Sequence, residues 1–168
     1  MNSLSFVEPT PHAGTPIDLV EETAEANDWP HERTGDEALT VEIAGRWGGY
    51  RLDFVWQEEM NAMHFSCGFE MDVAESRLPA VYELLASVNE KLWLGHFDLS
   101  REEGSPVFRQ TLLLGGAALL SSEQIEDLVD IAVAECERFY PAFHLVLCDG
   151  RTAGEALAAA VIDPVAEA

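Results

Sequence analysis

The spacing between apolar side chains changes several times along the chain, and each change predicts a new secondary-structure element. The first regular stretch has helical spacing, with apolar residues at Ile17, Val20 and Ala24. Thr15 can cap the start of this helix. Pro16 suits its first turn, where the missing N–H of proline costs nothing. We therefore expect the first helix to begin here.

Beyond the first helix the apolar period shortens to two, which is typical of strands with one buried and one exposed face. Three alternating runs, and a shorter strand that can precede them, lie at residues 32–34, 39–43, 50–56 and 63–69. Only short turns separate the three runs. Strands joined in this way pair as an antiparallel meander.

Helical spacing returns over residues 77–93, with Asn89 beside the apolar face. Almost no linker separates this predicted helix from two further strands, at residues 95–99 and 107–114. Polar residues, Arg109 among them, interrupt the second strand. We therefore expect one face of that strand to be exposed.

Two capping boxes, in which a Ser or Thr is followed three residues later by Glu or Gln, predict the last helices. The first box starts at Ser121 and opens a long apolar stripe that runs to residue 147. Pro141 must kink or end that helix, because its ring removes a backbone donor. The second box starts at Thr152 and opens an alanine-rich helix over residues 153–162.

This order of elements predicts an α+β fold, a twisted antiparallel sheet of five or six strands packed against helices. We expect the 77–93 and 121–147 helices to cover one face of the sheet. We expect the chain to divide into a flexible leader (1–14), one domain (15–148), and a short C-terminal helix with a tail (149–168). A hydrophobic content of 48% over 168 residues suffices for a core without disulfides or metal ions.

The charge of the chain narrows the classes of partner. There are 31 acidic and 9 basic residues, and the formal net charge is -22 at pH 7. We expect no nucleic acid and no membrane as partner, because phosphate and anionic lipid surfaces would be repelled. A basic partner is compatible with this charge, although solubility is the simpler interpretation. We also expect no signal peptide and no membrane-spanning helix.

The three cysteines Cys67, Cys136 and Cys148 form no Cys-x-x-Cys pair, which fits a cytoplasmic protein in a reducing compartment. Cys67 lies in an apolar strand. Cys136 lies between Glu135 and Glu137, whose charges would raise the pKa of its thiol. We expect both side chains to fill the core rather than to act as nucleophiles.

No segment carries a motif for catalysis, a cofactor or a metal ion. His96 and Asp98 point to the same side of one strand, but metal sites usually need three or more converging ligands. We interpret them as a structural polar pair. Gly115-Gly116 lacks the lysine of a phosphate-binding loop. We therefore predict a protein that is not an enzyme and has no catalytic residues, no cofactor and no metal site.

Arginine is scarce, and Arg33, Arg51 and Arg109 all lie on predicted strands. On the exposed face of a sheet they can receive an acidic or backbone-rich partner. The simpler interpretation is that they neutralise neighbouring carboxylates such as Asp53.

Aromatic residues with polar tips are typical interface anchors when they are partly exposed. Tyr82, Asn89 and Trp93 lie at one edge of the predicted 77–93 helix. We expect them to form the interface of a homodimer.

Several segments of the chain resemble the YbjN family, in particular its alphaproteobacterial branch. The segments are Gly45-Arg46-Trp47, residues 88–98, Phe108-Arg109 and residues 136–143. The family is described as a bacterial sensory transduction regulator, with a fold similar to type III secretion chaperones and often a dimer. The resemblance implies a cytoplasmic binding or regulatory protein, and it supplies no catalytic residues.

Three functions fit these observations. The first is a non-enzymatic, chaperone-like adaptor that acts as a homodimer and binds a protein client on a sheet face or edge. The alternative is a small-ligand sensor or enzyme with a pocket between sheet and helices, into which His64, His96 or Arg109 would converge. The third is a structural dimer whose acidity keeps an assembly soluble.

Overall fold

The computed structural model describes residues 14–115 and 120–162 of the chain. The predicted leader, apart from Gly14, and the tail beyond residue 162 lie outside the described residues. The described residues form six strands, four α-helices and two short 3-10 turns.

The six strands form one antiparallel sheet in the order β1-β2-β3-β4-β6-β5. Their bounds are β1 His31–Thr34, β2 Ala38–Gly45, β3 Gly48–Gln57, β4 Ala62–Phe69, β5 His96–Ser100 and β6 Ser105–Leu113. The first four strands are a meander, as their alternating pattern predicted. β6 then pairs with β4 and carries β5 at the far edge. The predicted α+β fold is confirmed.

The helices are α1 Pro16–Ala26, α2 Leu78–Asn89, α3 Ser122–Leu147 and α4 Ala153–Ile162. Both predicted capping boxes are present. The Ser121 hydroxyl accepts a hydrogen bond from the Gln124 N–H at 3.1 Å, and the Thr152 hydroxyl accepts one from the Glu155 N–H at 3.2 Å. These local side-chain bonds satisfy N–H groups that the first helical turn leaves free.

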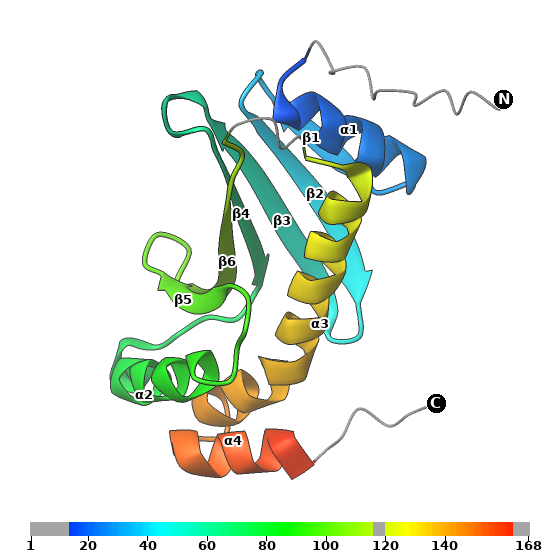
Figure 1. Cartoon of the computed structure of the whole chain (residues 1–168). Helices are drawn as coiled ribbons and strands as arrows, with labels where there is room; N and C mark the ends of the chain where they lie inside the picture. Colours follow the sequence, from blue (N-terminus) through cyan, green and yellow to red (C-terminus); the bar gives the residue numbers. More distant parts are fainter. Residues whose placement is uncertain (1–13, 116–119, 163–168) are drawn as a thin grey trace, which may run out of the picture.

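Figure 1 shows α1 and the long α3 against one face of the sheet, while α2 and α4 lie together beyond its lower end. The expectation that the 77–93 helix covers the sheet face is therefore wrong. The link after β4 carries the chain past the end of the sheet, and α2 packs on α3, α4 and β5. Arg77 secures this position by donating hydrogen bonds to the carbonyl groups of Val146 and Arg151, both at 2.9 Å.

α2 also ends earlier than the sequence predicted, at Asn89 rather than at residue 93. The Asn89 amide donates to the Phe97 carbonyl at 3.0 Å and accepts from the Phe97 N–H at 2.7 Å. The chain must therefore turn back beside the helix end, and Gly95 does so with a φ of 66°. A Cβ at Gly95 would lie 2.8 Å from the Arg109 carbonyl oxygen, so the turn requires glycine.

α3 continues through Pro141 over 26 residues, and its axis changes direction along its C-terminal half. Pro141 has no N–H to give to the carbonyl of Glu137 one turn earlier. The indole N–H of Trp47, from the β2–β3 turn, donates to that carbonyl at 3.3 Å. A side chain from the sheet thus satisfies the acceptor that the proline leaves free.

The core lies between the sheet and its two covering helices. Cys67 on β4 and Cys136 on α3 are both fully buried there, with their sulfur atoms 3.7 Å apart. The hydrogen bond to Cys67 and burial raise the pKa of the Cys136 thiol well above its ordinary value. The prediction that both cysteines fill the core is confirmed.

Tyr50 is a buried core residue whose hydroxyl has no hydrogen-bond partner among the described residues. Burial, with the charge of Glu137 in second place, raises the pKa of this phenol, so it stays neutral. A buried polar atom without a partner costs stability.

We expect Tyr50→Phe to raise the free energy of unfolding by about 1 kcal/mol in urea denaturation. Tyr82→Phe, at an exposed tyrosine, is the control and should leave it unchanged. A clear loss of stability in Tyr50→Phe would show that the hydroxyl has a partner.

Candidate functional site

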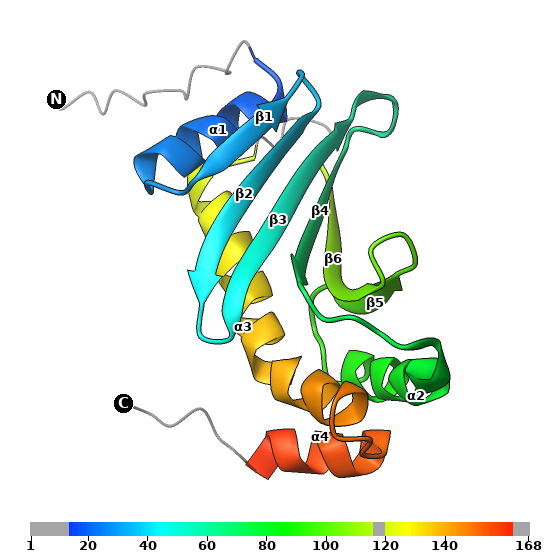
Figure 2. The same cartoon turned by 180° about the vertical axis from the view of Figure 1, so that it is seen from behind.

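One face of the sheet carries no helix in the part of the chain that the structure describes. Figure 2 looks onto this face, with α3 behind the strands. We call it the open face. Its central side chains are Thr40 and Glu42 on β2, Arg51 and Asp53 on β3, His64 and Ser66 on β4, Arg109 and Thr111 on β6, and His96 and Asp98 on β5. These residues alternate along each strand with buried residues on the other face, and the open face is therefore polar.

A broad hollow of about 1300 Å³ spreads over the open face and reaches the β2–β3 turn. Small residues form much of its floor, among them Ala44, Gly49, Ser66, Gly68 and Ser105. Its charged lining is five carboxylates and one guanidinium, namely Glu42, Asp53, Glu70, Asp72, Glu103 and Arg51. The hollow is therefore strongly negative, and its floor allows an extended chain to come close to the sheet.

The one guanidinium of the hollow is engaged by a neighbour on its own strand. Arg51 donates to Asp53 at 3.2 Å, and Asp53 also accepts a hydrogen bond from the Thr40 hydroxyl at 2.6 Å. The bond to Asp53 raises the pKa of Arg51, and the charges of Asp53, Glu103 and Glu42 add to the shift. The other four carboxylates of the hollow form no ion pair with any described residue.

The three residues that sequence analysis placed in a pocket between sheet and helices lie on the open face instead. His64 contacts the Thr111 hydroxyl at 3.1 Å, Arg109 pairs with Asp98 at 3.3 Å, and His96 is exposed beside them. Burial, followed by the charges of Arg109 and His96, lowers the pKa of His64. The predicted pocket lining is wrong. Side chains alternate between the two faces of a strand, and it is the residues next to these three that face the helices.

The other strand arginine also pairs with carboxylates nearby. Arg33 lies 2.7 Å from Asp18 and 2.6 Å from Glu21, both on α1. The interpretation that arginines on the strands neutralise local acidic groups is confirmed for Arg33, Arg51 and Arg109.

The outer edge of β5 is closed by side chains. The N–H of Phe97 donates to Asn89, and the N–H of Leu99 donates to the Asp98 carboxylate at 2.8 Å. These groups point away from β6 and are the ones that an added strand would need. Strand addition is therefore disfavoured at β5, which leaves β1, with four residues, as the other edge.

We expect Asn89→Ala to lower the free energy of unfolding by about 1–3 kcal/mol, because two buried backbone groups of Phe97 lose their partners. The same change opens the β5 edge, so self-association should increase with concentration. Urea denaturation and light scattering measure the two effects. Ser87→Ala, two residues earlier on α2, is the control, because its hydroxyl bonds only the Glu83 carbonyl of its own helix. Equal behaviour of the two variants would contradict the assigned role of Asn89.

The predicted interface residues differ in exposure. Two of them, Tyr82 and Trp93, are exposed, and the third, Asn89, is not available to a partner. Trp93 is fully exposed and Tyr82 is 45% exposed, and Leu94 beside Trp93 is 53% exposed. Asn89 is directed inward onto β5. The homodimer stays a prediction, with Tyr82 and Trp93 as its available anchors.

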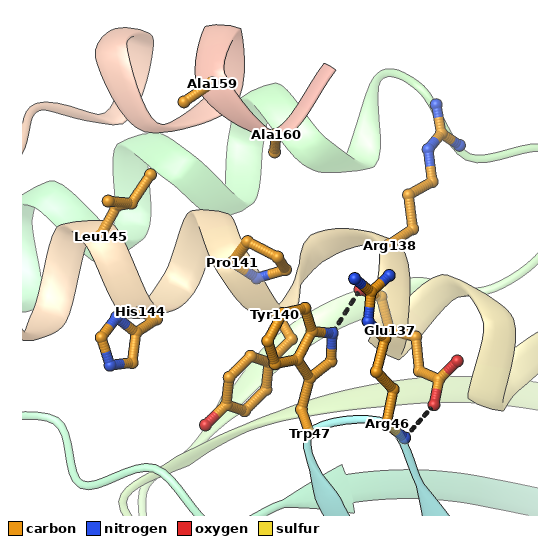
Figure 3. A pocket seen from close by; sticks show the side chains of 10 residues that line it. All are labelled: Arg46, Trp47, Glu137, Arg138, Tyr140, Pro141, His144, Leu145, Ala159 and Ala160. Atoms are coloured by element: carbon orange, nitrogen blue, oxygen red, sulfur yellow. Dashed lines mark hydrogen bonds between the residues drawn. The ribbon is translucent and has the colours of Figure 1, made fainter. Parts of the chain in front are cut away.

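A second recess, which we call the α4 cleft, has a volume of about 490 Å³ (Figure 3). Its lining residues are Arg46, Trp47, Glu137, Arg138, Tyr140, Pro141, His144, Leu145, Ala159 and Ala160. They come from the β2–β3 turn, α3 and α4. Sequence analysis missed this cleft, because its two principal contributors are 90 residues apart in the chain. The proline inside a helical pattern was the one visible signal, since it predicts a carbonyl that needs another donor.

Among the described helices, none combines the length and the apolar character that a membrane-spanning segment requires. The same residues contain no group of three or more His, Cys, Asp or Glu side chains placed to hold a metal ion.

The comparison with protein families decides the family. A model described as "Putative bacterial sensory transduction regulator", named YbjN, matches residues 16–145. The chain belongs to the YbjN family. Residues 45–47 and 136–143, two of the segments that carried the resemblance, meet in space where Trp47 contacts α3.

A solved structure agrees with this assignment at the level of the fold. The match is the crystal structure of YbjN from E. coli, described as "a putative transcription regulator". It has 15% sequence identity and a TM-score of 0.52, and it covers 71% of this chain and 84% of the other. No curated protein matches the sequence.

Proposed function

We propose that this YbjN-family protein is a non-enzymatic regulatory protein that binds a positively charged segment of a partner protein in the hollow of its open face. The observation that carries the proposal is the hollow itself, with four carboxylates that no described residue pairs. A chaperone-like or adaptor role follows, since such a protein acts by holding a segment rather than by changing it.

The chemistry of the hollow selects the partner. Carboxylates on an uncovered sheet attract lysine and arginine side chains, and the net charge of -22 accelerates their approach. The same charge opposes binding of nucleic acid. A regulator of this composition therefore acts through protein partners. The small residues of the floor let an extended segment lie close to the strands.

The description of the family supports a regulatory rather than a catalytic role. The proposal also includes a cellular location and an oligomeric state. We place the protein in the cytoplasm, where its free cysteines fit a reducing compartment. We expect it to act as a homodimer through the surface around Tyr82 and Trp93, because exposed aromatic residues are typical interface anchors.

The test is mild affinity capture of the tagged full chain from its native lysate, followed by mass spectrometry and light scattering of the complex. We expect a stoichiometric protein partner with a lysine- or arginine-rich segment, released as the salt concentration rises. A partner without such a segment, or capture that is insensitive to salt, would overturn the proposal. So would a clean preparation with nothing bound.

A further inference from the structure

We infer that the α4 cleft binds a small planar aromatic anion, such as an aromatic carboxylate. The cleft adjoins the hollow of the open face, since Trp47 and Tyr140 line both, but Arg46 and the α4 residues line the cleft and not the hollow. The cleft has the volume of an ordinary small-molecule site, about 490 Å³, and combines apolar walls with few polar groups.

One wall of the cleft is a column of flat side chains (Figure 3). The rings of Trp47 and Tyr140 stack with centroids 5.5 Å apart and an angle of 4° between them. His144 continues the column on the far side of Tyr140, with ring centroids 6.3 Å apart. Trp47 nevertheless keeps 40% of its surface exposed. The opposite wall is aliphatic and consists of Pro141, Leu145, Ala159 and Ala160.

Hydrogen bonds to α3 hold the Trp47 end of the column in place. Trp47 is held by its bond to the Glu137 carbonyl, and the N–H of Arg46 donates to the Glu137 carboxylate at 2.6 Å. Gly45 permits this close approach, since a Cβ there would lie 2.7 Å from the Glu137 carboxylate. Pre-organised walls lower the entropy cost of binding.

Arg46 supplies the polar end of the cleft. Its guanidinium lies 4.8 Å from the centre of the Trp47 ring and forms no ion pair with any described residue. This is notable in a chain with 31 acidic residues. Glu137, the one carboxylate among the lining residues of the cleft, already accepts a hydrogen bond from the backbone N–H of Arg46. A guanidinium with free donors beside an aromatic wall fits a carboxylate on a planar body.

The probe is 8-anilino-1-naphthalenesulfonate, an aromatic anion whose emission rises in apolar sites, titrated into the full chain. We expect saturable binding that Arg46→Gln weakens about tenfold, because one charge-assisted contact is lost. Ala159→Phe, which fills the cleft and leaves the core intact, should abolish binding. The neutral analogue N-phenyl-1-naphthylamine should be insensitive to Arg46→Gln.

Two controls separate the cleft from other surfaces. Arg101→Gln removes an exposed arginine from the β5–β6 turn, and Met60→Ala removes an exposed apolar side chain from the β3–β4 turn. Both variants should bind the probe as the natural chain does. Binding that survives Ala159→Phe, or that is lost in Met60→Ala, would overturn the inference. Failure here leaves partner capture by the open face unaffected, so the two proposals can fail separately.

Discussion

Changing Glu42, Glu70 and Asp72 to their amides together should weaken binding of the partner's basic segment by about tenfold to a hundredfold. These three carboxylates line the hollow, are exposed and form no ion pair with a described residue, so their removal costs the fold little. Each would face a lysine or arginine of the bound segment. The loss should be largest at low salt, where charges are least screened.

The measurement is a titration of the captured partner, or of its basic segment, at two salt concentrations. The matched control changes Glu37, Glu58 and Glu59 to glutamine. This removes the same number of charges from the turns at the opposite end of the sheet. We expect the control to bind within about twofold of the natural chain, since only long-range attraction is lost. Equal weakening by both triple variants would mean that net charge, not the hollow, attracts the partner.

Phe97→Ala should lower the free energy of unfolding by about 3–5 kcal/mol, the largest stability effect that we predict. The Phe97 ring joins β5 to the neighbouring strand β6 and to the covering helix α3. Its centroid lies 5.6 Å from Phe108 on β6, and 5.9 Å and 5.5 Å from Phe139 and Phe143 on α3. Truncation leaves a cavity among three aromatic rings that cannot close up.

Urea denaturation followed by circular dichroism checks this prediction. Phe97→Leu should cost less than the alanine variant, because it leaves a smaller void. Met60→Ala, at an exposed position of the turn between β3 and β4, should change the free energy of unfolding by less than about 0.5 kcal/mol. A Phe97→Ala variant as stable as Met60→Ala would contradict the assignment of Phe97 to the core.

The elements that sequence analysis located best are those with a local cause. The side-chain hydroxyls of Ser121 and Thr152 each bond an N–H three residues away, and both helices begin there. The alternation of buried residues likewise revealed the strands, since a one-residue shift would expose the core face. The end of α2 is set instead by a hydrogen bond from Asn89 to Phe97, eight residues away. The apolar periodicity carries no sign of this bond, so the predicted helix ran on to residue 93.

The candidate sites were harder to predict, because they depend on contacts between segments that are far apart in the chain. His64, His96 and Arg109 were recognised as polar groups, but which face they occupy depends on which side of the sheet the helices cover. The α4 cleft depends on Trp47 reaching the carbonyl that Pro141 leaves free, a contact between segments 90 residues apart. A spacing pattern carries no signal for a contact of that kind.

The central claim is that the open-face hollow holds a basic segment, and carbodiimide cross-linking of the captured complex tests it most directly. The reagent joins a carboxylate to a lysine amine only where the two are in contact, with loss of one water. We predict cross-links from the partner's lysines to Glu42, Glu70, Asp72 or Glu103, identified by mass spectrometry. Cross-links confined to carboxylates outside the hollow, such as Glu58 and Glu59, would contradict the account.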